Sequence, residues 1–553
     1  MAADRLSALP DDLLRRVLYF APAKEGASTA VLSRRWRSLW RSSGAINLDW
    51  RSYHRAHGSG IVTFQELGIF FPAVKAALDA VDGRLTRLTF NVEADEMVFI
   101  LLIVPGRSPI EHSMVDLALA HPSAQHLEEL RVAAVNYRPD PSRELHYWFC
   151  LASLPSETLR DLQLINCTYL TPAPPGTIFP RLAALRLQGC KVSIECLQDT
   201  INAAPQLFTL HLESSKFTEE RTVDGVQVRC HRLRFPVVIA LVFADCSWSG
   251  EEEEAAMLEL DLPRVRYFRY RGHVHNRLFL KPHEPSSVVR ADLNFTGYQH
   301  GDVGNIRAHF WQFVTQNFHM VKVLKLILDF AIDRVAVVDK DGQDDILMNK
   351  LFYNVQHLEL QGRYKPANKM AGFAIGNLLQ CCPVVRDLNL KVTAIASAES
   401  SLQSSVGTQA QLDFEKSYNH FRQRKRQPIS SGRDDDDKTY EDEISDVRGL
   451  SKRSFNCLQS CLRRVSLQFR MDVPNCFGVQ LTKFFAENSQ VLVELYVDDG
   501  SHKMCEHMNW MVRKWIANSS KRKTPPTATS IVDQCSRKRQ RREDHCGDCS
   551  CVQ

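Results

Sequence analysis

The sequence between residues 159 and 190 contains one pattern twice, as LRDLQLINC at residues 159–167 and as LAALRLQGC at residues 182–190. In each copy the three leucines are separated first by two residues and then by one, and a cysteine closes the pattern. Successive residues of a strand point to opposite faces, so the last two leucines give a short strand one apolar side. Neither strand can bury that side alone, so we expect the copies to stack into a parallel sheet with a shared core.

The same spacing recurs along most of the chain, in units that lie about 23 to 34 residues apart. The further units are Leu85-Leu88-Phe90, Leu127-Leu130-Val132, Leu207-Leu210-Leu212, Val238-Leu241-Phe243, Val265-Phe268-Tyr270, Leu293-Phe295, Val321-Leu324-Leu326, Val355-Leu358-Leu360, Val385-Leu388-Leu390, Leu462-Val465-Leu467 and Leu492-Leu495-Val497. Apolar triplets also occur by chance in α/β proteins, but so many recurrences in register favour a repeat array. With Cys167, Cys190 and Cys246 in the closing position, the pattern resembles the strand-and-turn half of a leucine-rich repeat.

A different pattern occupies residues 4–40, DRLSALPDDLLRRVLYFAPAKEGASTAVLSRRWRSLW. Pro10 suits the first turn of a helix, and the acidic residues after it lie near the positive end of the helix dipole. Apolar residues at helical spacing predict one apolar face made of Leu13, Leu14, Val17 and Leu18. Pro22 ends this helix, and Ser33 can cap a later one that carries Trp36. Three short helices cannot bury all these side chains, so the stretch either awaits a partner or caps a larger helical domain.

The string Leu-Pro-Asp-Asp-Leu-Leu, followed by Val31-Leu32-Ser33-Arg34-Arg35-Trp36, resembles an F-box, most closely those of plant proteins that also carry leucine-rich repeats. The resemblance implies docking onto the Skp-type adaptor of a cullin-based ubiquitin ligase. The residues expected to bind the adaptor are Leu9, Pro10, Leu13, Leu14, Val17, Leu18, Val31, Leu32 and Trp36. Family members usually have larger apolar residues where this chain has Ala21, Gly26 and Ala27, so we expect weaker packing of the middle helix.

These patterns predict an α/β fold in which a small N-terminal helical F-box is followed by a curved leucine-rich-repeat solenoid with a parallel strand face. The predicted domains are an F-box at 1–45, a connector at 46–83 with a helix over 71–81, the solenoid at 84–393, a disordered insertion at 394–450, C-terminal repeats at 451–517 and a disordered basic tail at 518–553. The C-terminal repeats resemble the FBD region of such plant proteins, on the strings CLRRV (461–465), FFAEN (484–488) and VLVEL (491–495).

Residues that alternate with the core leucines should form the strand face, which repeat arrays commonly use to bind partners. In this register they include Asp161, Gln163, Arg186, His211, Tyr267, Arg269, Arg271, Lys325, His357 and Glu359. Tyr267, Arg269 and Arg271 are the densest group, and aromatic and Arg side chains dominate many interfaces. We therefore expect this group, with Arg186 and His211, to bind an acidic surface of a target protein. The alternative is that they are ordinary solvated strand residues.

The tail contains two basic clusters separated by a Pro/Thr/Ser spacer. Lys521, Arg522 and Lys523 form the first, and Arg537, Lys538, Arg539, Arg541 and Arg542 form the second. The layout resembles a bipartite nuclear import signal, although a solvated basic tail would look the same. We therefore expect the protein in both nucleus and cytoplasm.

Composition and missing motifs narrow the function. The net charge of +5 makes nucleic acid an unlikely partner, and the longest apolar run, at residues 97–104, is far too short to cross a membrane. Sixteen cysteines without an N-terminal signal peptide indicate reduced thiols. Phosphate loops, dinucleotide motifs and a nucleophile elbow are not found, so we expect no cofactor and no enzyme activity. His545, Cys546, Cys549 and Cys551 are more simply free side chains than metal ligands, and we predict no metal site.

The resulting interpretation is a non-catalytic substrate-recognition subunit of a Skp–cullin–F-box ubiquitin ligase, which would bind an unknown target protein for ubiquitination and proteasomal degradation. Two alternatives stay open on the sequence alone. The protein could be a nuclear binding module whose basic tail contacts nucleic acid, or a scaffold that binds the adaptor without turning over a substrate.

Overall fold

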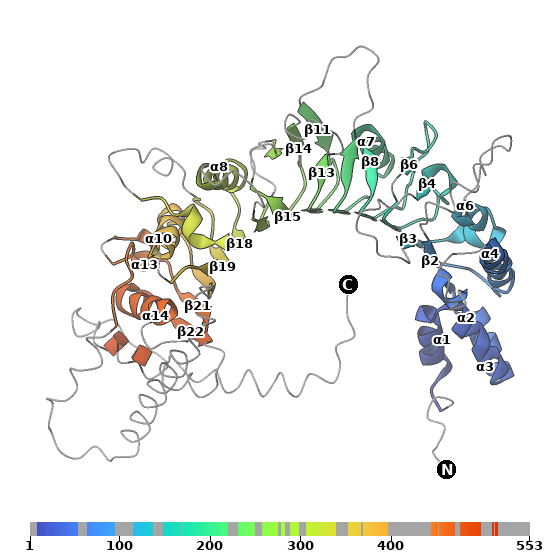
Figure 1. Ribbon diagram of the computed structural model, residues 1–553, viewed down its shortest axis with the longest axis horizontal. Coiled ribbons are helices and arrows are strands. Elements are labelled where there is room, and N and C mark those ends of the chain that lie inside the picture. The colour runs from blue at the N-terminus through green and yellow to red at the C-terminus, as the bar shows by residue number, and fades with distance from the viewer. Residues whose placement is uncertain are drawn as a thin grey trace. The chain divides into compact units, whose positions relative to one another are not determined.

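The computed structural model in Figure 1 describes residues 8–53, 64–93, 114–135, 147–167, 169–218, 230–248, 257–274, 278–281, 288–297, 306–338, 352–366, 369–395, 444–451, 453–470, 476–498, 511–513 and 515–517. The chain divides into two compact units. Unit 1 comprises Met1–Arg269 and Arg277–Ser287, and unit 2 comprises Tyr270–Asn276 and Val288–Gln553.

Unit 1 begins with three short helices, as the sequence predicts. They are α1 (Asp11–Phe20), α2 (Ala23–Ser28) and α3 (Arg34–Arg41), with the 3-10 turn η1 (Thr29–Val31) between α2 and α3. Pro10 precedes α1 in an extended conformation, and Pro22 separates α1 from α2. The Ser33 hydroxyl caps α3 by accepting a hydrogen bond from the Trp36 amide at 3.3 Å. The predicted stop, start and cap are therefore all confirmed.

A parallel sheet follows the helices. Its strands are β1 (Ala45–Asp49), β2 (Arg87–Glu93), β3 (Glu129–Val135), β5 (Asp161–Ile165), β7 (Ala184–Gln188), β9 (Thr209–Glu213) and β12 (Ala240–Ala244), paired in that order. The register places Leu162 opposite Leu185, Leu185 opposite Leu210 and Leu210 opposite Leu241. These leucines are at most 1% exposed, so the stacked core predicted from the repeats is confirmed. The strand β15 (Tyr267–His273) comes next, and its first three residues belong to unit 1.

The predicted connector at 46–83 is wrong at its beginning, because it contains most of β1. Ile46 lies opposite Leu88 and Leu48 opposite Phe90 in a parallel pair with β2. The first strand lacks the leading leucine of the repeat pattern, so its two apolar residues were not recognised as a unit. The helix expected over 71–81 exists as α4 (Phe64–Asp79), which begins earlier and ends slightly sooner.

Short strands and helices return the chain between the strands of the main sheet. The short sheets are β4 (Trp148–Cys150) with β6 (Tyr169–Thr171); β8 (Lys191–Ser193), β10 (Lys216–Thr218) and β13 (Ser247–Trp248); and β11 (Cys230–Arg234), β14 (Met257–Asp261) and β16 (Leu278–Leu280). The helices are α6 (Met114–Leu119) and α7 (Ile194–Ala203), with the turns η2 (Trp50–Tyr53), η3 (Pro122–His126) and η4 (Leu151–Ser153). The short strands of successive units pair with one another in parallel, so they form sheets separate from the main sheet.

Four consecutive units turn in the same way after the strand. The turning residues Asn166, Gly189, Ser214 and Asp245 all have positive φ, between 49° and 63°. Glycine and short polar residues tolerate this conformation best. In the last three of these units the next residue bonds a carbonyl of the preceding strand: the Cys190 thiol donates to Leu164 at 3.4 Å, the Ser215 hydroxyl to Leu187 at 3.3 Å and the Cys246 thiol to Leu212 at 3.5 Å. Cys190 and Ser215 are buried, and Cys246 is half-buried. Ser215 therefore takes the place of the expected cysteine.

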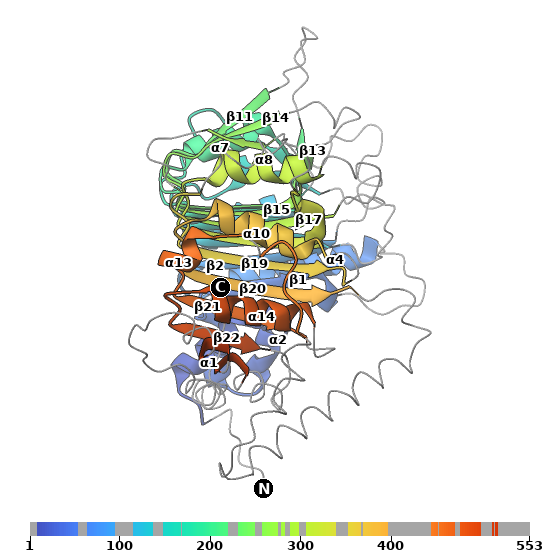
Figure 2. The same cartoon turned by 90° about the vertical axis from the view of Figure 1, so that its left-hand side faces the viewer.

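Unit 2 has the same construction. Its strands β17 (Arg290–Thr296), β18 (Val323–Ala331), β19 (His357–Tyr364), β20 (Asp387–Ala394), β21 (Arg464–Phe469) and β22 (Glu494–Asp498) pair in parallel in that order. The helices are α8 (Ile306–Phe318), α10 (Ala371–Cys381), α13 (Asn456–Ser460) and α14 (Phe477–Asn488), with the turn η5 (Ile332–Val335). Figure 2 shows α10 and α14 lying across one face of these strands. The opposite face carries the residues that alternate with the core.

The predicted disordered insertion at 394–450 needs correction at its end, because residues 444–450 pack into unit 2. Ile444, Val447 and Leu450 are at most 5% exposed. The backbone at residues 448–449 lies so close to α10 that only glycine fits at Gly372 and Gly376. These apolar residues are not in repeat register, which is why the sequence pattern did not reveal them. The rest of the predicted insertion, from residue 396 to 443, lies outside the described residues.

Candidate functional site

The helices α1 and α3 enclose a small core that accounts for part of the predicted adaptor-binding set. Leu14, Leu18, Trp36 and Leu39 are 0–7% exposed and form one cluster, against which Leu9 and Trp40 pack. Leu14, Leu18 and Trp36 therefore have interior positions and support the surface from beneath. The expectation that Leu13, Leu14, Val17 and Leu18 share one face is wrong, because Leu14 and Leu18 point inward while Leu13 and Val17 point outward.

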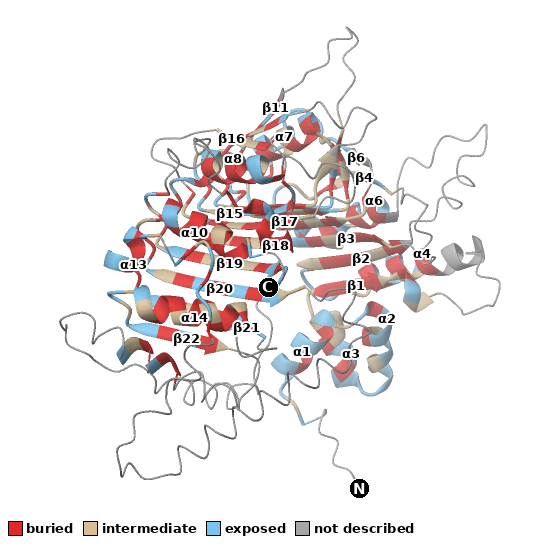
Figure 3. Ribbon diagram, turned by 60° about the vertical axis from the view of Figure 1, so that its left-hand side comes forward, coloured by how far each residue is buried: buried red, intermediate tan, exposed pale blue. Residues whose placement is uncertain are grey.

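The outward set is unusually apolar. Leu13, Val17, Val31 and Leu32 are 50%, 54%, 88% and 69% exposed, and Pro10 is also exposed. Val31 and Leu32 are the two most exposed large apolar side chains among the described residues. Phe20, 59% exposed at the end of α1, belongs to the same helix face and was missed, although it follows Val17 by three residues. Figure 3 shows that α1 has exposed positions along its length.

An ion pair brings the two apolar segments together. The Arg35 guanidinium, at the start of α3, lies 2.6 Å from the Asp11 carboxylate at the start of α1 and donates to the Leu9 carbonyl at 2.7 Å. The turn that carries Val31 and Leu32 immediately precedes α3 and packs against it, so the ion pair joins the helix that follows this turn to the start of α1.

The small residues of α2 have a packing role that the sequence did not reveal. A Cβ atom on Gly26 would lie 2.6 Å from the indole ring of Trp40. Such a contact is closer than packed atoms allow, so glycine is required for α2 to approach α3. The departure at Gly26 therefore tightens the packing of the middle helix and corrects the expectation that it would be weaker.

The helices are joined to the repeat sheet by specific contacts within unit 1. The Asn47 side-chain amide of β1 donates to the carbonyls of Tyr19 and Ala21 at 2.9 and 3.0 Å. Arg87 of β2 stacks on the rings of Tyr19 and Phe20, with its guanidinium carbon 5.3 and 5.0 Å from their centroids. Burial, followed by the nearby Glu129 carboxylate, raises the pKa of Tyr19. The end of α1 is therefore fixed on the first two strands.

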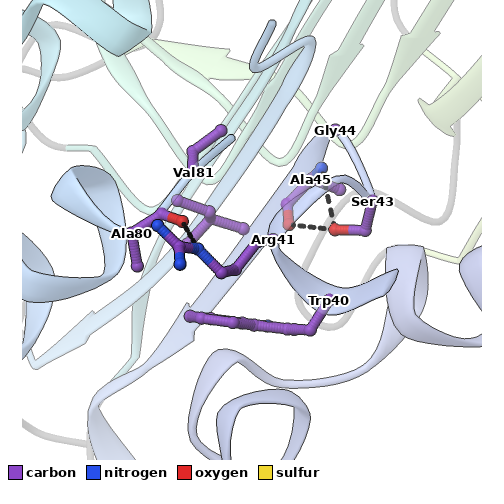
Figure 4. A pocket seen from close by; sticks show the side chains of 8 residues that line it. Trp40, Arg41, Ser43, Gly44, Ala45, Ala80 and Val81 are labelled. Atoms are coloured by element: carbon purple, nitrogen blue, oxygen red, sulfur yellow. Dashed lines mark hydrogen bonds between the residues drawn. The ribbon is translucent and has the colours of Figure 1, made fainter. Parts of the chain in front are cut away.

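A second junction lies around Arg41, at the end of α3. Its guanidinium donates to the Ala80 carbonyl at 2.8 Å and forms an ion pair with Asp82 at 2.9 Å. Figure 4 shows Arg41 bridging to Ala80 beside Trp40, around a small hollow that these side chains line. The arrangement connects α3 to the segment that leads into β2, so its role is structural.

The predicted target-binding residues lie on the strand face, as expected from their spacing. Arg186 and His211 are half-buried register partners on β7 and β9, and Arg269 on β15 is exposed. Tyr267 is half-buried on β15, and Arg271, exposed on the same strand, belongs to unit 2. The remaining predicted strand-face residues, Asp161, Gln163, Lys325, His357 and Glu359, are all half-buried or exposed. In unit 2 such residues have acidic partners: Lys325 lies 2.9 Å from Glu359, and the His357 Nδ1 atom lies 2.6 Å from the Asp387 carboxylate.

Electrostatics distinguish the strand face of unit 1. Burial lowers the pKa of His211, and the positive charges of Arg186 and Arg269 lower it further. Burial likewise lowers the pKa of Arg131, with a contribution from Arg87. Burial raises the pKa of Asp161, although Arg186 and Arg87 oppose the shift. His211 is therefore neutral at pH 7 between two permanent cations.

Metal ligands and membrane-spanning helices can be looked for in the part of the chain that the structure describes. Among those residues, no group of three or more His, Cys, Asp or Glu side chains is placed to hold a metal ion. None of the described helices is long and apolar enough to span a bilayer. The basic clusters of the tail, from Lys521 to Lys523 and from Arg537 to Arg542, and the residues His545, Cys546, Cys549 and Cys551 all lie outside the described residues.

The fold and the exposed helical surface define a chain with an F-box in front of leucine-rich repeats, and comparison with known proteins agrees. The family model for the F-box domain matches residues 6–45. A second model, described as "FBD-associated F-box protein At5g56370, LRR repeats", matches residues 115–268. The F-box domain implies binding to a Skp-type adaptor.

Similar proteins are found in Arabidopsis thaliana. The F-box/FBD/LRR-repeat protein At5g22700 is 46% identical over 299 residues, which are 52% of this chain and 56% of that protein. The putative F-box/FBD/LRR-repeat protein At5g44950 is 25% identical over 296 residues, 53% of this chain and 58% of that protein. These alignments span little more than half the length of the relatives. The chain thus carries an F-box and leucine-rich repeats, and it is similar to plant proteins of the F-box/FBD/LRR-repeat type.

Proposed function

We propose that this protein is a substrate receptor of a Skp–cullin–F-box ubiquitin ligase. The observation that carries the proposal is the apolar surface of the F-box, where Val31 and Leu32 are 88% and 69% exposed although the helices have a buried core of Leu14, Leu18, Trp36 and Leu39. Exposed apolar clusters of this kind are characteristic of surfaces that bind a partner. The Skp-type adaptor would cover this surface and connect the chain to a cullin.

The proposed mechanism requires no catalytic residue. The F-box would hold the chain on the adaptor, and the strand face of the repeats would hold a target protein near a conjugating enzyme carried elsewhere in the complex. Ubiquitin transfer then gains from the raised effective concentration of the target. The contacts of Asn47 and Arg87 with the end of α1 support this arrangement, since they fix the F-box on the first strands of unit 1.

Co-purification tests the adaptor part of the proposal. A chain that lacks residues 1–42 begins just before β1 and should no longer retain a Skp-type adaptor. Because this deletion also removes contacts to β1, the double variant Leu13→Asp with Val17→Asp gives a second measurement on an intact chain. Ile178→Asp is the matched control, since Ile178 is 58% exposed in unit 1 and outside the helices. Retention of the adaptor by both F-box variants would contradict the proposal.

The localisation is also a proposal. We propose that the basic clusters of the tail direct part of the protein to the nucleus, supported by their bipartite layout at residues 521–523 and 537–542. A fluorescent fusion of residues 519–553 should concentrate in nuclei, whereas the same fusion with both clusters changed to Gln should not. An even distribution of the unchanged fusion would contradict the import signal and leave the adaptor proposal unaffected.

A further inference from the structure

Two arginines of unit 1 stand out on the strand face. Several other cations of that face have acidic or polar side-chain partners: Arg87 lies 3.7 Å from Glu129, Arg464 forms a double hydrogen bond with Asp387, and Arg131 donates to the side-chain oxygen of Asn91 at 3.0 Å. By contrast, no ion pair to a carboxylate is formed by Arg186 or Arg269 within the described part of the chain. The Nε atom of Arg186 is buried and has no hydrogen-bond partner there.

The sheet brings these arginines to one row. Arg186 lies opposite His211, and His211 lies opposite Val242, on the consecutive strands β7, β9 and β12. The Ile239 carbonyl accepts hydrogen bonds from the amides of Arg266 and Tyr267, which places Arg269 beside Val242. Neighbouring strands lie about 4.8 Å apart, so the α-carbons of the two arginines are about 14 Å apart. A neutral imidazole and a valine fill the space between them.

We propose that this row, Arg186, His211, Val242 and Arg269, binds an extended acidic segment of the target protein, with one carboxylate on each guanidinium. Guanidinium groups bind carboxylates through paired hydrogen bonds. An extended segment advances about 3.3 Å per residue, so acidic residues about four positions apart would reach both arginines. An apolar residue between them would lie over Val242, which is 9% exposed.

The charge of the row favours a dicarboxylate segment over a polyanion. Since His211 is neutral at pH 7, the row carries two full positive charges, and the Asp161 carboxyl lies close enough to interact with Arg186. A nucleic acid or polyphosphate would bring an excess of negative charge that these residues do not match. The proposal rests on the receptor function above, because it identifies the kind of target that the strand face selects.

The test uses the full chain in complex with its adaptor and three fluorescent probes. The probes are a peptide with two glutamates four residues apart around a central leucine, the same peptide with glutamines, and a single-stranded 12-nucleotide DNA. We expect the glutamate peptide to bind in a salt-dependent manner and the glutamine peptide to bind at least tenfold more weakly. The double variant Arg186→Gln with Arg269→Gln should bind the glutamate peptide at least tenfold more weakly. The double variant Arg186→Lys with Arg269→Lys should have an affinity between that of the Gln variant and that of the unchanged chain.

The matched control is Arg181→Gln with Arg264→Gln, which removes the same charge from exposed positions before β7 and β15. Equal loss in this control, absence of glutamate-peptide binding by the unchanged complex, or tighter binding of the DNA would each overturn the proposal. Retention of the adaptor is measured on the same samples. If the unchanged chain does not retain the adaptor, the receptor function is contradicted. If the adaptor is retained but the glutamate peptide does not bind, only the acidic-segment proposal is contradicted.

Discussion

Truncating Val31 and Leu32 to alanine should weaken adaptor binding by about 150-fold. Each buried methylene contributes about 0.8 kcal/mol, and the two truncations remove two and three carbons. A partner can bury only the part of each side chain that is exposed, which is 88% for Val31 and 69% for Leu32. Scaled by these fractions, the loss is about 3 kcal/mol of binding free energy. Because both side chains already face solvent, the free energy of unfolding should change by less than about 0.5 kcal/mol.

The assay is calorimetric titration of the purified adaptor into each variant, with thermal unfolding measured in parallel. Leu14→Ala is the informative comparison, because Leu14 is fully buried and its truncation should cost about 2–5 kcal/mol of stability. A weakening of less than about threefold in the Val31/Leu32 variant would show that these residues lie outside the interface. A drop in its melting temperature as large as that of Leu14→Ala would instead show that the binding loss reflects unfolding.

Three further predictions concern stability. Gly26→Val should overpack the contact with Trp40 and cost about 1–3 kcal/mol in urea unfolding, whereas Gly297→Ala, whose Cβ would meet nothing closer than 3.9 Å, should not. Leu185→Asp should bury an unpaired charge and lower the melting temperature of unit 1 while sparing adaptor binding, and an unchanged melting curve would contradict the register. Burial raises the pKa of the Cys246 thiol from 9.0 to about 12, so on raising the pH the unfolded chain loses this proton before the folded chain does. The contribution of the Cys246 thiol to the free energy of unfolding should therefore be complete below pH 9 and fall toward pH 12. Urea titrations of Cys246→Ala should show a smaller fall over this range.

The repeat architecture could be predicted because its physical cause is local. A leucine spacing of three and then two residues gives every strand the same apolar side, so the register of β5, β7, β9 and β12 follows directly from sequence. The turn after these strands could not be predicted in the same way. This turn requires a residue with a left-handed backbone conformation, and four different residue types occupy the position: Asn166, Gly189, Ser214 and Asp245.

Elements without the full pattern were the ones missed. β1 offers only Ile46 and Leu48 to the core, and its pairing with β2 depends on contacts from residues more than 30 positions away. Similarly, Val447 and Leu450 follow a long polar segment whose composition predicts disorder, yet α10 presents glycines against which the backbone of residues 448–449 packs. In both cases tertiary contacts decide the structure, and the neighbouring sequence has too few regularly spaced apolar residues to predict these elements.

The F-box surface shows the same limit at the level of single side chains. Helical spacing groups Leu13 with Leu14 and Val17 with Leu18, but adjacent residues are rotated by about 100° around a helix, so one member of each pair faces Trp36 and the other faces solvent. Only the position of α3 decides which member turns inward. The binding segment could therefore be recognised from sequence as a whole, whereas the division between side chains that build the domain and side chains that meet the adaptor required the packed helices. This division makes the two kinds of alanine variant separable by experiment, since one set changes stability and the other changes affinity.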